Sequence, residues 1–112
     1  MPKPPIRRVS EDVLRKIFNN GKYWERAQKG LLRSKLVANS HPSSPRAKEP
    51  ICTRSQYIIY INNKGQKVAG VHQYLRPDGK LGASGRPDPK ELLVKGVLYV
   101  VDTQNVKPRH SP

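Results

Sequence analysis

The apolar residues in the first third of the chain repeat with the spacing of a helix. Four of them fall on one helical face: Val13, Leu14, Ile17 and Phe18. Ser10, just before them, is a typical N-cap residue, and two acidic residues follow it where the helix dipole favours negative charge. Residues 19–21 read Asn-Asn-Gly, a common helix end. The pattern therefore predicts a helix between Ser10 and Gly21.

A second helix is predicted from about residue 22 to about residue 34. Trp24, Ala27 and Leu31 recur at spacings of three and four and mark its apolar face. The opposite face is basic and carries Lys22, Arg26, Lys29 and Arg33. Such a face suits a phosphate backbone. An ordinary solvated helix surface has the same composition, so both interpretations stay open.

The middle of the chain changes to the pattern of a hairpin. Residues 56–61 are aromatic and β-branched, residues 62–65 form a turn rich in Asn and Gly, and residues 66–75 return as a second strand. Alternation along that strand places Ala69, Val71 and Leu75 on one face. The other face carries Gly70, His72, Tyr74 and Arg76.

Residues 88–95 resemble a short helix, with Asp88 as N-cap, Pro89 at the first helical position and Glu91 closing a capping box. Residues 97–101 form an apolar third strand. The predicted fold class is α+β: two N-terminal helices, a β-hairpin, a short helix and a third strand, with a small antiparallel sheet packed on the helices. The domain spans 10–102 and contains a long loop at 38–55, between a flexible basic arm at 1–9 and a flexible tail at 103–112.

The net charge is the most informative feature of the composition. The 112 residues hold 22 Lys and Arg against 8 Asp and Glu, a formal net charge of +14. A polyanionic partner is the ordinary compensation for such self-repulsion, and we expect nucleic acid, RNA in preference to DNA. An acidic protein partner, an anionic membrane surface and a role independent of charge are the alternatives, the membrane being the least favoured. We expect no membrane partner, and the sequence leaves the oligomeric state open.

The same composition narrows the cellular setting. A lone Cys52 permits no internal disulfide, which fits a reducing compartment. No apolar run reaches the length of a membrane helix, and residues 1–5 lack the apolar segment of a signal peptide. We therefore expect a cytoplasmic protein.

A candidate site follows from the strand at 66–75. If its pleat is regular, His72, Tyr74 and Arg76 project from one side along roughly 13 Å, at about 3.3 Å per residue. An imidazole titrates near neutrality, a guanidinium holds phosphate and a phenol stacks on a base. The neighbouring loop adds Lys80 and Arg86 to the positive field.

This trio suits RNA binding, or RNA cleavage without metal in which His72 transfers the proton. Polar residues also alternate on any half-exposed strand, so an ordinary surface is the competing interpretation. The nucleic-acid contacts predicted across the chain are His72, Tyr74, Arg76, Lys80, Arg86, Arg26, Lys29 and Arg33. No catalytic residue other than the candidate His72 is assigned.

Other motifs are weak or lacking. Residues 82–85 read Gly-Ala-Ser-Gly and are similar to a loop that cradles an anion ahead of a helix at Asp88, although Asp88 itself would repel phosphate. One cysteine and three scattered histidines give no zinc spacing. We expect no metal and no cofactor.

The stretch H-Q-Y-x-R-P-D-G at 72–79, followed by S-G-x-P-D-P-K at 84–90, resembles a group of short uncharacterised prokaryotic proteins. The resemblance implies no activity. In architecture, helices followed by a small antiparallel sheet are similar to small ribonuclease and toxin folds of the barnase and RelE kind. No catalytic residue can be carried over from them, and the predicted strand face lacks the carboxylate of a barnase-like general base.

Three functions remain as hypotheses. The first is a small nucleic-acid-binding protein without catalysis, which the charge and the His72 face favour. The second is a metal-independent, toxin-like ribonuclease. The third is a non-catalytic adaptor that docks on an acidic protein or a ribonucleoprotein.

Overall fold

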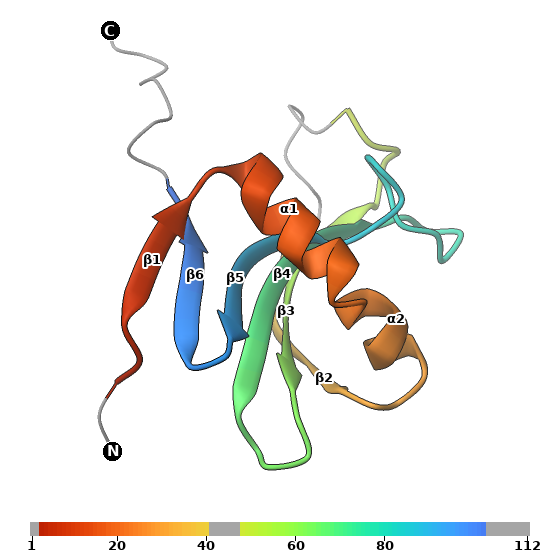
Figure 1. Cartoon of the computed structure of the whole chain (residues 1–112). Coiled ribbons are helices and arrows are strands. Elements are labelled where there is room, and N and C mark those ends of the chain that lie inside the picture. The colour runs from red at the N-terminus through yellow and green to blue at the C-terminus, as the bar shows by residue number, and fades with distance from the viewer. Residues whose placement is uncertain (1–2, 41–47, 103–112) are drawn as a thin grey trace, which may run out of the picture.

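Six strands form one mixed sheet in the computed structural model, which describes residues 3–40 and 48–102 (Figure 1). The elements in chain order are β1 (Ile6–Val9), α1 (Glu11–Asn20), α2 (Tyr23–Gln28), β2 (Arg33–Ser40), β3 (Arg54–Ile61), β4 (Lys67–Leu75), β5 (Asp88–Val94) and β6 (Val97–Val101). The strand order is β1-β6-β5-β4-β3-β2. Only the β1–β6 pair is parallel, and the other four pairs are antiparallel.

The predicted fold class was wrong. The sheet has six strands rather than three. The prediction lacked β1, β2 and β5, which the sequence patterns did not reveal. β1 and β2 are the two edges of the sheet, and β5 lies inside it. β1 pairs with β6, which is distant in sequence, whereas β2 pairs with β3 and β5 with both β4 and β6. Pairing with neighbouring strands stabilises an extended conformation, and the local residue pattern does not record this contribution.

β1 forms within the segment that was expected to be a flexible arm. Ile6 to Val9 pair with Leu98 to Val101, and flanking bonds from Leu98 N to the Pro5 carbonyl and from Asp102 N to the Val9 carbonyl extend the ladder. The predicted tail at 103–112 lies outside the described residues, as do residues 41–47 of the predicted long loop.

α1 begins as predicted. The Val13 backbone N–H donates to Ser10 Oγ at 3.2 Å, and Glu11 and Asp12 occupy the first turn. Leu14 and Phe18, one turn apart, are fully buried on the face turned toward the sheet. The apolar spacing in the sequence thus identified Leu14 and Phe18 as buried and Ile17 as partly buried, whereas Val13, predicted on the same face, is 44% exposed.

α2 is much shorter than predicted. It ends at Gln28, and Gly30 takes a positive φ of 81° that turns the chain out of the helix. As a result Leu31, which was assigned to the apolar face, is 64% exposed, whereas Leu32 is buried. The residues after Leu32 extend into β2 instead of continuing the helix.

β5 replaces the predicted helix at 88–95. Its residues pair with β4 on one side and β6 on the other. Pro89 lies opposite Val71, beside a shift of register between Gly70 and Val71. Proline is tolerated near strand starts and bulges, where a missing N–H donor does least harm. The Asp-Pro-Lys-Glu sequence satisfied the rules for a helix start, but two neighbouring strands decided the conformation.

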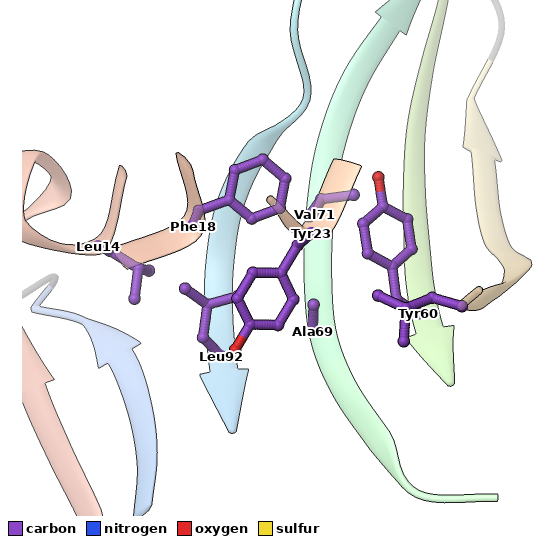
Figure 2. Packing of buried hydrophobic residues seen from close by; sticks show 8 residues of the cluster. Leu14, Phe18, Tyr23, Tyr60, Ala69, Val71 and Leu92 are labelled. Atoms are coloured by element: carbon purple, nitrogen blue, oxygen red, sulfur yellow. The ribbon is translucent and has the colours of Figure 1, made fainter. Parts of the chain in front are cut away.

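Both described helices lie on the same side of the sheet, and the core lies between them and the strands (Figures 1 and 2). The Phe18 ring stacks with Tyr23 at a centroid distance of 5.8 Å and with Tyr60 at 6.4 Å. Beneath these rings the strands contribute Ala69, Val71 and Leu92. We call this side the covered face. Alternate strand residues point to the opposite side, the open face, on which no helix of the described chain packs.

None of the helices in the described residues is long and apolar enough to cross a membrane.

Candidate functional site

A pocket lies at the end of the sheet where β4 extends beyond the start of β5. β4 pairs with β5 only as far as His72, opposite Asp88. Past that point β4 pairs with the loop that connects it to β5. The Gly82 N–H donates to the Tyr74 carbonyl at 2.8 Å, and Leu75 and Leu81 form a β-bridge. Residues 83–87 therefore bulge outward, and beside them opens a pocket of about 590 Å³.

His72 and Tyr74 form the aromatic wall of this pocket. Their rings meet edge to face, with centroids 4.7 Å apart and an interplanar angle of 88°. Ser55 Oγ on β3 lies 2.7 Å from His72 Nε2, which fixes the imidazole from the neighbouring strand. Strand alternation places all three side chains on the open face, as the sequence predicted for His72 and Tyr74.

The surroundings of His72 favour the neutral form of its imidazole. Burial lowers its pKa below 6.5, and the nearby Lys90 ammonium lowers it further, against a smaller opposing effect of Asp88. A neutral imidazole accepts one hydrogen bond and donates another. It can therefore contact a base edge, or take up a proton from a bound hydroxyl.

Cationic side chains outnumber carboxylates around the pocket. Arg15, Arg86 and Lys90 line it together with Asp88. Asp88 accepts from Arg15 Nε at 3.3 Å through one oxygen and from Lys90 Nζ at 3.0 Å through the other. A single carboxylate thus holds two cations in place, and the lining keeps an excess of positive charge.

Arg86 fastens the bulged loop to the helices. Its guanidinium donates to Glu25 Oε2 at 3.0 Å and Asn19 Oδ1 at 3.1 Å, and lies 4.6 Å from the centre of the Trp24 ring. A backbone hydrogen bond and then the Arg86 guanidinium lower the pKa of Glu25. Arg86 was predicted as a nucleic-acid contact. It borders the pocket, but its guanidinium already forms an ion pair with Glu25.

Arg76 is not brought together with His72 and Tyr74 as the sequence predicted. β4 ends at Leu75, and Arg76 Nε instead donates to Glu49 Oε1 at 2.7 Å. Glu49, whose side chain is 4% exposed, also accepts from the Ala83 N–H at 2.9 Å. Its pKa is lowered by the Arg76 hydrogen bond first and the Ala83 bond second. Arg76 therefore serves to anchor the loop.

The predicted anion cradle at 82–85 also has a different role. No helix follows it, because Asp88 begins β5. The anion that its backbone meets is the Glu49 carboxylate, which packs against Gly82 and accepts the Ala83 N–H. The carboxylate of Glu49 therefore occupies the place that the prediction gave to a bound anion.

The other predicted contacts are scattered. Lys80 is exposed in the turn after β4. Arg26 donates to the Gly21 carbonyl at 3.4 Å and lies 5.2 Å from the Tyr23 ring centre. Lys29 caps α2, and Arg33 lies on the edge strand β2. Since α2 ends before Lys29, these residues do not form the continuous basic helical face that was predicted.

A second polar group occupies the middle of the open face. The Tyr57 hydroxyl donates to Glu91 Oε2 at 3.3 Å, and Lys67 Nζ pairs with Glu91 Oε1 at 2.7 Å. Burial, reinforced by the Glu91 carboxylate, raises the pKa of Tyr57 to about 12. The Tyr57 hydroxyl therefore remains protonated and is already engaged.

Sequence reasoning missed Arg15, Ser55, Glu49 and Lys90 as parts of the site. Ser55 follows from the alternation of β3 once its register with β4 is known. Lys90 was hidden by the incorrect helix, and no pattern links Glu49 to Arg76 across 27 residues. In the part of the chain that the structure describes, no three His, Cys, Asp or Glu side chains converge as a metal site would require.

No protein-family model, curated protein or solved structure matches the chain.

Proposed function

We propose that this protein binds RNA, with the pocket beside His72 and Tyr74 as the contact site. The observation that carries the proposal is the combination in one open pocket of an aromatic pair and three cationic side chains, Arg15, Arg86 and Lys90. Aromatic rings stack on unpaired bases, while lysine and arginine neutralise the phosphates between them. The net charge of +14 supplies the long-range attraction.

The pocket favours single-stranded RNA over a duplex. Tyr74 can contact a base face only if that base is unstacked, and the bases of an A-form helix are paired and stacked. The excess of cations around one carboxylate, Asp88, remains favourable for a phosphate. Base stacking and charge neutralisation then act together at one place on the surface.

The test is fluorescence anisotropy of labelled single-stranded RNA, duplex RNA and duplex DNA at several salt concentrations, with EDTA present. Single-stranded RNA should bind most tightly, and Tyr74→Ala should weaken it by about tenfold, the effect of removing one stacked base. Lys90→Ala should weaken binding and lower the salt slope by about one. Undetectable RNA binding at low salt would reject the proposal and leave the acidic-protein adaptor as the hypothesis to pursue.

Lys64 provides a matched control for Lys90. It lies exposed in the β3–β4 turn and does not line the pocket. Lys64→Ala removes the same charge as Lys90→Ala, so it should leave both affinity and salt slope close to those of the unmodified protein. Equal losses from the two substitutions would mean that total charge, rather than the pocket, determines binding.

Metal-independent cleavage of the bound RNA is a second candidate function, favoured by the place of His72 in the pocket lining, where burial lowers the pKa of its imidazole. His72 would take the proton of a ribose 2′-hydroxyl while that oxygen bonds to phosphorus. The bond from phosphorus to the 5′-oxygen would break, and the leaving oxygen would gain a proton from water. The products are a 2′,3′-cyclic phosphate and a free 5′-hydroxyl.

Gel analysis of RNA incubated with the protein in EDTA tests this candidate. Cleavage that is lost in His72→Gln, with RNA binding kept, would support His72 as the base. Intact RNA at saturating protein would leave a binding function alone.

A further inference from the structure

Aliphatic side chains gather on the open face near the turn between β5 and β6. The strand register places Leu93 of β5 opposite Leu98 of β6, and Leu98 opposite Ile6 of β1. Val100 follows Leu98 by two residues, so it points to the same side of the sheet. None of these four side chains belongs to the core cluster or packs against it. We call them the open-face cluster.

Alternation along β6 supports this placement. Tyr99 and Val101 pack against the core, so Leu98 and Val100 lie on the opposite side of the strand. Both are only partly buried, and Ile6 is 62% exposed. α1 and α2 lie on the other side of the sheet (Figure 1). Aliphatic groups that neighbour one another across strands on an open sheet face are typical of a docking surface.

Cations border the open-face cluster. The register places Arg8 of β1 opposite Val100, and Lys95 lies exposed in the β5–β6 turn that adjoins the cluster. Neither Arg8 nor Lys95 forms an ion pair within the described residues. Glu91, which lies opposite Val100 on β5, is already paired with Lys67 at 2.7 Å. The border of the cluster therefore offers two cations to a ligand.

We propose that the open-face cluster docks a helix of an acidic protein, with an apolar stripe of that helix on the cluster and its Asp or Glu residues beside Arg8 and Lys95. The cluster crosses three neighbouring strands over about 10 Å, close to two turns of a helix. Helices are the ordinary cover of a sheet face, and their residues at i, i+3, i+4 and i+7 form such a stripe.

The chemistry of the open-face cluster disfavours other occupants. Aliphatic side chains have no ring on which a base can stack and no group that reads a base edge, so RNA is a poor match. A second copy of the chain carries the same net charge of +14, which opposes association face to face. The same charge attracts an acidic protein.

The docking site lies apart from the pocket and does not rest on the proposed function. β5 begins at Asp88, which lines the pocket, and reaches Leu93 of the open-face cluster five residues later. At about 3.3 Å per residue this distance is roughly 16 Å. RNA in the pocket therefore leaves the cluster free, and the two ligands can be tested independently.

The experiment selects a displayed library of helical peptides on the full-length protein. The peptides are about 16 residues long, so that the helix is stable enough in water. Leu, Ser, Glu and Lys are allowed equally at the varied positions of an alanine background. We expect the enriched peptides to carry Leu at the i, i+3, i+4 and i+7 positions and to prefer Glu over Lys beside them. The best peptide is then labelled, and its affinity is measured by fluorescence anisotropy.

Variants with matched controls locate the bound peptide. Leu98→Ser should weaken it by about tenfold, as expected at the centre of an interface. Leu36→Ser, which changes a 47% exposed leucine of the edge strand β2, should not. Arg8→Glu should weaken the peptide by about threefold and reduce the salt dependence of binding. Arg54→Glu should leave both unchanged, because Arg54 is exposed on β3 with three strands between it and β1.

Equal losses from Arg8→Glu and Arg54→Glu, with no loss from Leu98→Ser, would mean that net charge alone attracts the peptide and would overturn the docking site. A dimer in sedimentation equilibrium that Leu98→Ser dissociates would assign the open-face cluster to a second copy and overturn it as well. So would single-stranded RNA whose binding Leu98→Ser weakens as much as that of the peptide.

The outcomes also separate this inference from the proposed function. Peptide binding at the open-face cluster without any RNA binding would reject the proposed function alone. RNA binding without enrichment of any peptide would overturn the docking site alone. If Leu98→Ser does not fold, the comparison of Arg8→Glu with Arg54→Glu decides, since both replace exposed side chains.

Discussion

The covered and open faces of the sheet are built from alternate residues of the same strands, yet their chemistry differs. On the covered face Val71 and Leu92 are at most 1% exposed, and they belong to one hydrophobic cluster with Phe18 of α1. On the open face Tyr57 and His72 are partly buried and hydrogen-bonded to polar partners. Most of the apolar burial that stabilises the fold lies on the covered face. The polar groups of the open face can therefore be arranged for a ligand.

The largest effect that tests this division is loss of a core ring. Phe18→Ala removes an aromatic side chain that stacks on both Tyr23 and Tyr60. We expect the free energy of unfolding, measured by denaturant titration, to fall by about 3–5 kcal/mol. Tyr74→Ala on the open face should cost about 1 kcal/mol or less. Similar losses from the two substitutions would contradict the assignment of stability to the covered face.

Gly70 offers an intermediate effect on the open face. A Cβ at this position would collide with the Tyr57 hydroxyl and approach Glu91 Cγ to 3.0 Å. Gly70→Ala should therefore lower the free energy of unfolding by about 1–3 kcal/mol, because the Tyr57 ring must move. Tyr57→Phe in the same protein should recover part of this loss. Additive effects of the two substitutions would show that the Tyr57 ring is not what Gly70 accommodates.

The smallest expected effect is the dependence of stability on pH through His72. Its pKa is lower in the folded protein than in the unfolded chain. Between these two pKa values the unfolded chain binds more protons, so stability should fall as the pH drops below about 6.5. In His72→Gln the free energy of unfolding, measured by denaturant titration at several pH values, should depend less on pH in this range. An unchanged slope in His72→Gln would place the responsible group elsewhere.

The parts of the fold that could be predicted are those encoded by neighbouring residues. Ser10 and the spacing of Leu14 and Phe18 identified α1, and alternation identified β4 and the shared face of His72 and Tyr74. β5 could not be predicted, since Asp88, Pro89 and Glu91 satisfy the rules for a helix start and only β4 and β6 override them. β1 has four residues and no strand pattern of its own.

The site divides in the same way. The sequence indicated the aromatic pair, because both residues lie on one strand. It assigned Arg76 and Arg86 to a ligand, although Glu49 and Glu25 engage them across 27 and 61 positions. Which cations are already paired depends on long-range contacts, and a single sequence reports only that basic residues are in excess.

Pairing of β1 with β6 gives the chain an order of assembly during its synthesis. Ile6 to Val9 leave the ribosome well before their hydrogen-bonding partners, Leu98 to Val101. α1 likewise packs on β5, which is translated long after it. At about 5–20 residues per second the nascent chain exposes the apolar side of α1 for several seconds. We therefore expect β1 and α1 to stay without their partners in the nascent chain until β5 and β6 have been translated, with chaperone binding concentrated on the first helix during that interval.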